Sequence, residues 1–246
     1  MEDVSALRLC EVKTYFDVIA RGGSDRLLWA RSFHNLGEFG PDDYARLSEI
    51  LLDAGARTSV SFLGREAERY AETIEALDAA GHEIVLHGHR HVACDDIDYD
   101  LAYENVSRGR AAIEEAAGVT PRGFIAPRQE VNAATLSVLE EFDFEWVLGR
   151  TDATVPEGIE FHELEHPYDL IILNEGADPE ETFDRIETQT RPGAALLFHP
   201  NMLDYYDAFD QFESWIAETQ PVTIGTLLQE GGVGMITDAM RPLRID

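Results

Sequence analysis

Short apolar runs alternate with longer amphipathic segments along most of this chain of 246 residues. Several of the short runs are nearly continuous in Val, Ile, Leu and Phe, which is typical of strands buried on both faces of a parallel sheet. The segments expected to form strands are 27–33, 59–63, 83–87, 123–126, 144–148, 168–173 and 194–198, with 233–237 as an eighth candidate.

Helical patterns fill the intervals between these runs. The expected helices are 41–54, 66–80, 101–117, 133–142, 205–218 and 223–229, and a further helix begins after Asp178. Strands that alternate with helices through short connections pair in parallel through right-handed crossovers, so the order predicts an α/β fold wound as a closed or nearly closed barrel. We expect residues 1–246 to form a single domain, in which 1–26 is an N-terminal extension.

The composition is strongly acidic. Acidic residues outnumber basic residues by 48 to 19, which gives a formal net charge of −29. A surface this negative repels phosphate backbones and anionic lipids, so we expect neither nucleic-acid nor membrane partners. Lys13 is the single lysine. Abundant carboxylates with almost no lysine favour a halophilic organism, where concentrated salt screens the self-repulsion of the surface.

Targeting signals and cysteine patterns favour the cytoplasm. The acidic N-terminus lacks a signal-peptide pattern, and no apolar run is long enough to span a membrane. Cys10 and Cys94 lie far apart and in no metal-binding spacing, so we interpret them as reduced, structural thiols.

Histidines gather at the carboxyl ends of the expected strands, where parallel α/β barrels carry their reactive groups. Five of the eight histidines lie there: His34, His87, His89, His91 and His199. His87 and His91, four residues apart after one strand, can reach a single metal ion, although a histidine-rich polar loop would have the same sequence. His82 precedes that strand and is expected to be structural, and His162 and His166 flank an acidic loop and are expected to face solvent.

The segment 81–91 resembles the second motif of the polysaccharide deacetylases, the NodB-homology or carbohydrate esterase 4 group. That motif reads G-H-E-I followed by H-x-x-x-H, as it does here. Segments 56–64, 123–127 and 196–200 resemble the family's second strand, its G-F-R-x-P motif and its final L-x-x-H motif. The four motifs follow one another in the family's order, and the resemblance runs from about residue 27 to residue 229.

The resemblance implies a distorted (β/α) barrel of about seven parallel strands and a divalent metal, usually zinc. In the family, one aspartate and two histidines hold the metal; the matching residues here are Asn35, His87 and His91. The implied reaction is hydrolysis of an N-acetyl amide, or of an O-acetyl ester, on a glycan or a smaller sugar substrate. His34 stands in the place of the family's base, and His199 in the place of its acid.

The first motif departs from the family. Residues 32–35 read S-F-H-N where the family has T-F-D-D, and Ile125 replaces the arginine that orients the family's base. Asn35 can coordinate through its carbonyl oxygen, or His34 can itself complete a three-histidine site. The third alternative is that no metal binds, and the chain is then a degenerate binding protein or a metal-free, allantoinase-like amidohydrolase.

Two further residues are candidates for substrate binding. Arg128, at a strand end, can bind a substrate carboxylate or hydroxyl, or it can pair with Glu130 or another surface acid. Trp146 can serve as a platform for a sugar ring, although tryptophan in a strand more often belongs to the core. Asp152, just beyond a strand end, is expected to line the rim.

Overall fold

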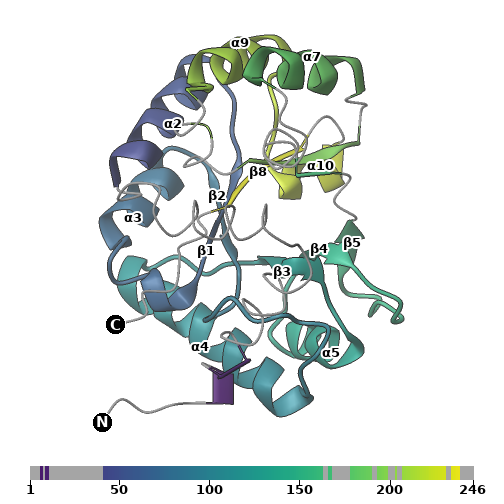
Figure 1. Cartoon of the computed structure of the whole chain (residues 1–246). Coiled ribbons are helices and arrows are strands. Elements are labelled where there is room, and N and C mark those ends of the chain that lie inside the picture. Colours follow the sequence, from purple (N-terminus) through teal and green to yellow (C-terminus); the bar gives the residue numbers. More distant parts are fainter. Residues whose placement is uncertain are drawn as a thin grey trace. The chain divides into compact units, whose positions relative to one another are not determined.

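The computed structural model of the chain divides into two compact units, and each unit is formed by separate stretches of the sequence (Figure 1). Unit 1 contains Met1–Gly23, Ser61–Glu75 and Ile84–Glu163, and unit 2 contains Ser24–Val60, Ala76–Glu83 and Leu164–Asp246. The structure describes residues 6–7, 9–10, 41–162, 166–167, 178–189, 193–198, 203, 207–230 and 234–238.

Unit 1 is a parallel sheet with helices between its strands. Along the sheet the strands follow the order β5-β4-β3-β2-β1. Each strand pairs in parallel with its neighbour from β2 to β5, and Val85 is opposite Gly123 in the β2–β3 pair. The strands are β1 (Ser59–Phe62), β2 (Glu83–Leu86), β3 (Gly123–Glu130), β4 (Trp146–Arg150) and β5 (Glu160–His162).

The helix expected at 66–80 is shorter, Ala71–Ala79, and the helix expected at 101–117 begins two residues earlier, at Tyr99. The Asp98 side chain accepts a hydrogen bond from the backbone N–H of Leu101 at the start of α4, and Gly118 ends that helix with a φ of 68°. α4 lies beside α5. The elements are the short 3₁₀ helix η1 (Gly64–Glu66), α3 (Ala71–Ala79), which continues into unit 2, α4 (Tyr99–Ala117) and α5 (Ala133–Glu141).

In unit 2 the strands follow the order β8-β7-β6, and the register of β6 with β7 and of β7 with β8 is parallel. Its core is rich in aromatic rings, among them Phe198, Phe212 and Trp215. The elements are α2 (Pro41–Asp53), β6 (His166–Pro167), α7 (Pro179–Gln189), β7 (Ala195–Phe198), α9 (Phe209–Thr219), α10 (Ile224–Glu230) and β8 (Gly234–Asp238).

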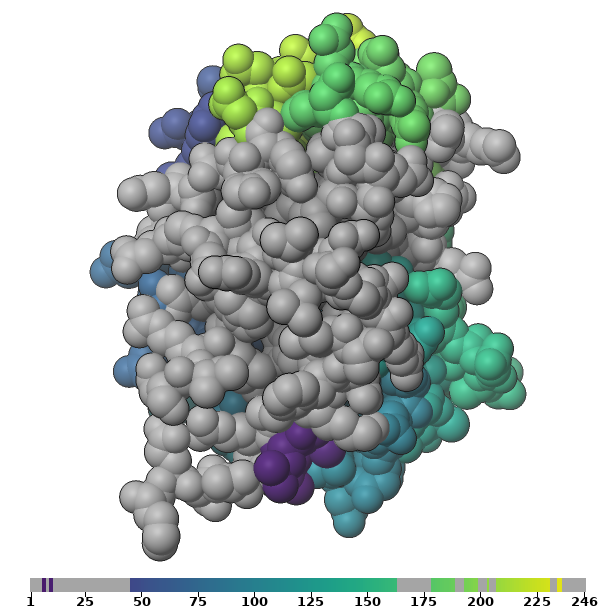
Figure 2. Space-filling view, in the orientation of Figure 1, coloured from purple at the N-terminus to yellow at the C-terminus, as the bar shows by residue number. Residues whose placement is uncertain are grey.

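In helix α7 the acidic side chains and the apolar side chains lie on different faces. Phe183 and Ile186 are buried in the core, whereas Glu181, Asp184 and Glu187 are exposed. Figure 2 shows the residues of α7, in green, at the molecular surface. The apolar stripe therefore binds the helix to the core, while the carboxylates lie in solvent.

The predicted α/β class with parallel strands is confirmed, and closure into a barrel stays a prediction. The expected strands 27–33 and 168–173 lie outside the described residues. His162 ends β5 and His166 begins β6, so the two histidines flank the acidic segment between them, as expected, although neither strand was predicted. These strands are only two or three residues long, too short to give a periodic pattern.

In the described ranges, no helix combines the length and the apolar character that a membrane crossing needs. Neither Cys10 nor Cys94 is found in a disulfide there. Cys94 is fully buried, and this burial raises the pKa of its thiol far above the usual value.

Candidate functional site

The carboxyl ends of β2, β3 and β4 meet at one edge of the unit 1 sheet, because these neighbouring strands are parallel. His87 follows the last residue of β2 directly, Arg128 lies near the end of β3, and Arg150 ends β4. The edge therefore brings together residues that are far apart in the sequence, as the strand-end argument predicted.

His87 and His91 lie close together at this edge. Their ring centroids are 5.1 Å apart with an angle of 59° between the ring planes. Both residues are buried, with 2% and 5% of their surface exposed. The two imidazoles are therefore near enough to share one ligand and are shielded from bulk water.

A backbone carbonyl fixes the tautomer of His87. Its Nδ1 lies 2.8 Å from the carbonyl oxygen of Ile125 on β3. Because a carbonyl oxygen only accepts, Nδ1 carries the hydrogen and Nε2 has the lone pair. This arrangement is the usual one for a metal-binding histidine, whose other ring nitrogen is held by a carbonyl or carboxylate.

The surroundings of His91 favour its neutral form. Burial is the main cause that lowers its pKa well below the ordinary value, and the neighbouring His87 and the positive charge of Arg65 lower it further. A neutral imidazole is the form that ligates a metal. The donor chemistry of the two residues therefore fits a divalent ion of the zinc type.

The predicted third ligand and the predicted acid and base cannot be placed. His34, Asn35 and His199 all lie outside the described residues. Within the described ranges, no group of three or more His, Cys, Asp or Glu side chains is arranged to hold a metal ion.

The loop between the two histidines is bound to η1. The backbone N–H of Gly64 donates to the carbonyl of Gly88 at 2.9 Å, and that of Arg65 donates to the carbonyl of His89 at 3.1 Å. Gly88 has a φ of 84°, a left-handed conformation that side chains other than that of glycine seldom adopt. The sharp turn that the sequence predicted at Gly88 is therefore present.

Arg128 lies in an irregular part of β3. The β3–β4 register shifts between Ile125 and Glu130, and Arg128 and Gln129 have φ values of 61° and 64°. No hydrogen bond or ion pair of the Arg128 side chain is found in the described part of the chain, so the alternative of a pair with Glu130 is not observed. Arg128 is partly exposed, and its charge is among those that lower the pKa of His91.

The position of Trp146 argues against the predicted substrate contact. Its side chain is 2% exposed and lies at the first residue of β4, on the opposite end of the strand from Arg150. A Cβ atom added at Gly123 would collide with the Trp146 ring. A ring packed this closely on a neighbouring strand belongs to the core and cannot stack on a sugar.

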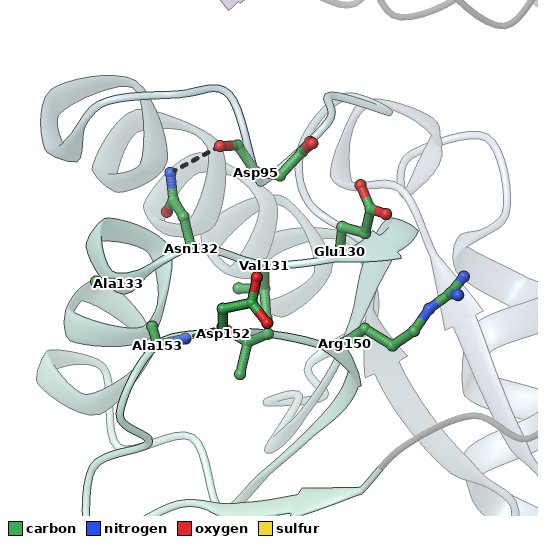
Figure 3. A pocket seen from close by; sticks show the side chains of 9 residues that line it. Asp95, Glu130, Val131, Asn132, Ala133, Arg150, Asp152 and Ala153 are labelled. Carbon is green, nitrogen blue, oxygen red and sulfur yellow. Dashed lines mark hydrogen bonds between the residues drawn. The ribbon is translucent and has the colours of Figure 1, made fainter. Parts of the chain in front are cut away.

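A pocket of about 600 Å³ lies beyond the ends of β3 and β4. Asp95, Glu130, Arg150 and Asp152 contribute charged side chains to its lining (Figure 3). Asn132 is also in the lining, and its amide donates to the backbone carbonyl of Asp95 at 3.5 Å. The volume is within the range of roughly 300–1,000 Å³ that is usual for small-molecule sites. The pocket includes Asp152, which the sequence placed at the rim, and Asp95, which it did not single out.

Comparison with known proteins agrees with the motifs. Residues 33–147 match the family model described as polysaccharide deacetylase. Over 101 residues the chain is 30% identical to the peptidoglycan deacetylase-like protein FGM2 of Gibberella zeae. The match covers 40% of this chain and 30% of that relative, so the chain spans about three tenths of the relative's length.

Solved structures of polysaccharide deacetylases and carbohydrate esterases are similar in fold to this chain. A Mycobacterium smegmatis protein assigned to the polysaccharide deacetylases is 24% identical, with a TM-score of 0.64 over 86% of this chain and 79% of that one. A family 4 carbohydrate esterase from Streptomyces lividans is 19% identical, with a TM-score of 0.58 over 78% and 91% of the two chains.

A third similar structure is a CE4 family pseudoenzyme from Bacillus anthracis, 16% identical, with a TM-score of 0.61 over 82% of this chain and 66% of that one. At these identities the structures establish the fold alone. The sequence of residues 33–147 is similar to the polysaccharide deacetylases, and the likeness of fold extends over most of the chain.

Proposed function

We propose that this protein is a metal-dependent hydrolase that removes the acetyl group from an N-acetylated sugar or glycan. The observation that carries the proposal is the buried pair of His87 and His91, with the hydrogen of His87 held on Nδ1 by the carbonyl of Ile125. Burial, short separation and a fixed tautomer are together the properties that a pair of metal ligands requires.

The two histidines would hold the ion, and Asn35 or His34 would complete the site. A zinc-type ion supplies polarisation of the acetyl carbonyl and a water of lowered pKa. If His34 is not a ligand, its imidazole would be the group that accepts a proton from the attacking water. His199 follows β7 directly and takes the role of the acid that protonates the leaving amine.

The pocket beyond β3 and β4 is the proposed sugar site. Carboxylates and a guanidinium, such as those of Glu130, Asp152 and Arg150, bond well to hydroxyl groups, and the volume admits a small molecule. Arg128 is proposed to contact substrate at the same edge, since no other partner occupies its side chain in the described part of the chain.

A salt-rich cytoplasm is the proposed location, supported by the net charge of −29 and the single lysine. A substrate inside the cell would be a nucleotide-linked sugar, a glycolipid precursor or another small amide rather than a finished wall polymer.

The principal alternative is a degenerate deacetylase that binds its ligand without turnover. The family's two aspartates are missing at His34 and Asn35, and one structural neighbour is a CE4 family pseudoenzyme. A mutant of that neighbour is described as having restored enzymatic activity. In this chain, the double substitution His34→Asp and Asn35→Asp would restore the two aspartates of the family's first motif.

The test measures acetate release from soluble N-acetylglucosamine oligomers at several KCl concentrations, with Zn²⁺, Co²⁺ or Mn²⁺ added or removed. We expect release that chelation abolishes and that His87→Gln lowers by at least about 100-fold. His162→Gln, at the partly exposed end of β5, is the matched control and should retain activity.

Two other outcomes reject the proposal. Activity that survives exhaustive chelation would instead identify a metal-free amidohydrolase. Activity that is absent from the natural chain with every metal but gained by the double aspartate variant would identify a degenerate scaffold.

A further inference from the structure

Asn105, on helix α4, bonds three successive peptide groups of the loop between His87 and His91. Its backbone carbonyl accepts from the N–H of His89 at 2.9 Å. Its side-chain Oδ1 accepts from the N–H of Arg90 at 2.8 Å, and its Nδ2 donates to the carbonyl of Arg90 at 3.3 Å. The carbonyl of Arg90 belongs to the peptide bond that joins Arg90 to His91.

The surroundings of Asn105 leave little space for any other arrangement. Its side chain is buried, with 1% exposed. A Cβ atom at Gly88 would lie 2.7 Å from Nδ2 of Asn105, and one at Gly109 would lie 2.7 Å from the backbone nitrogen of His89. Helix α4 therefore contacts the histidine loop backbone to backbone, which is feasible only because both positions are glycine.

The other side of the loop is held by η1 through the backbone of Gly64 and Arg65. A Cβ atom at Gly64 would also collide with the backbone of Gly109. The loop is thus fixed between two elements, and the Asn105 side chain bonds the peptide groups on both sides of Arg90. This bond pattern sets the direction in which the chain enters His91.

We propose that Asn105 is a positioning residue that holds His91 beside His87 in the geometry that metal binding requires. The inference rests on the proposed function, since it assigns a role toward the ion that the two histidines would hold. Asn105 acts through the backbone of Arg90 and has no contact with the ion or substrate in this role.

Two substitutions separate the donor and acceptor bonds of Asn105. Asn105→Leu removes both side-chain bonds at similar volume and leaves the Arg90 N–H without its acceptor. Asn105→Asp keeps an acceptor for that N–H but no longer donates to the Arg90 carbonyl. Ile113→Ala, fully buried on the same helix and outside the loop contacts, is the control for general loss of stability.

The first readout is the dissociation constant for Co²⁺, followed by its visible absorption in the intact protein, beside the midpoint of thermal unfolding. We expect Asn105→Leu to weaken Co²⁺ binding by about 10- to 100-fold, the usual effect of removing a residue that orients a metal ligand. Asn105→Asp should weaken it less, whereas Ile113→Ala should lower the unfolding temperature without changing Co²⁺ affinity. Equal Co²⁺ affinity in Asn105→Leu and the natural chain would overturn the proposal.

The second readout needs no metal. Amide hydrogen exchange of Arg90 should become at least tenfold faster in Asn105→Leu, while the amide of His87, bonded to the Phe62 carbonyl in the sheet, should not change. Unchanged exchange at Arg90 would overturn the positioning role. If the natural chain binds no Co²⁺, the proposed function fails, and the exchange result still decides whether Asn105 fixes the loop.

Discussion

The imidazole of His87 donates its Nδ1 hydrogen to the carbonyl oxygen of Ile125, 2.8 Å away on the neighbouring strand. Ile125 stands where the resembling family has an arginine, so the side chain at this position has changed while the backbone still supports the histidine. In the neutral ring this bond leaves the lone pair on Nε2, the atom that would bind the proposed metal.

The first prediction concerns this tautomer. In the metal-free protein at neutral pH, His87 should be found with its hydrogen on Nδ1, because the carbonyl of Ile125 can only accept. Nitrogen-15 correlation spectra of histidine-labelled protein distinguish the two tautomers, and the signal is assigned by its loss in His87→Gln. A His87 ring with its hydrogen on Nε2 would contradict the geometry.

The second prediction concerns stability in acid. His82 is buried, and burial, followed by the charge of Arg57, lowers its pKa to about 4. Its Nδ1 accepts from the backbone N–H of Thr58 at 3.3 Å, and Nε2 lies 3.4 Å from Oγ of Ser48. Because Nδ1 accepts, the neutral ring has its hydrogen on Nε2, so His82 cannot act as a base toward Ser48.

The sign of the pH effect follows from the two pKa values. The unfolded chain binds this proton near pH 6.5, whereas the folded protein binds it only near pH 4. The contribution of His82 is therefore complete above pH 6.5, and it is lost as the pH falls toward 4, by at most about 3 kcal/mol. Urea unfolding at fixed KCl should show a shallower pH dependence for His82→Asn. His162→Asn, partly exposed, should keep the natural slope, and equal slopes in all three proteins would refute this account.

The third prediction concerns a buried polar group at the start of α10. The Ser59 hydroxyl donates to the carboxylate of Glu83, which also accepts from the backbone N–H of Gly225 at 3.1 Å. Oγ of Ser59 accepts from the N–H of Ile224 at 2.8 Å. These bonds satisfy donors that the first turn of a helix leaves open.

Replacing Ser59 with Ala removes the acceptor for Ile224 and the donor to Glu83. We expect the free energy of unfolding to fall by about 1–3 kcal/mol, since buried polar groups lose their partners. Ser137→Ala, exposed on α5, is the control and should change it by less than about 0.5 kcal/mol. A natural unfolding free energy in Ser59→Ala would show that this network is dispensable.

The fourth prediction uses the contact between Gly123 and Trp146. A methyl group at Gly123 would overlap the buried ring, so Gly123→Ala should destabilise the protein by roughly 1–3 kcal/mol or more. Gly158→Ala is matched to it, because a Cβ atom there meets nothing within 4 Å. Thermal unfolding should separate the two variants. Similar unfolding temperatures would mean that Trp146 is not packed on this strand and is available to ligands after all.

The sequence could predict those strands and helices in which the spacing of apolar residues repeats over several positions. The strands β2, β3 and β7 were recognised because each contains a run of apolar residues. Helix α4 was recognised because its apolar residues recur at helical spacing and a glycine follows it. β5 was missed, because Glu160–His162 mixes one apolar residue with two polar ones. The pair of His87 and His91 was predicted, since one loop after one strand carries both.

What the sequence could not predict depends on contacts between distant segments. Nothing in the spacing links Asn105 to Arg90, because the bond depends on how closely α4 approaches the loop. The bond from His87 to the carbonyl of Ile125 could not be predicted either, because every residue has a backbone carbonyl and the sequence does not show which one faces the histidine. The sequence left Trp146 between the core and a sugar platform. The strand was predicted at 144–148 and is Trp146–Arg150, and a pattern displaced by two positions does not tell which end of the strand a residue occupies.

The most direct test of the central claim is a calorimetric titration of metal-free protein with Zn²⁺ in concentrated KCl, repeated for His87→Gln, His91→Gln and the control His162→Gln. We expect one Zn²⁺ per chain for the natural protein and for the control, and loss of this binding in both other variants. A natural chain that takes up no Zn²⁺ at saturation, or binding that survives both substitutions, would contradict the assignment of His87 and His91 as ligands.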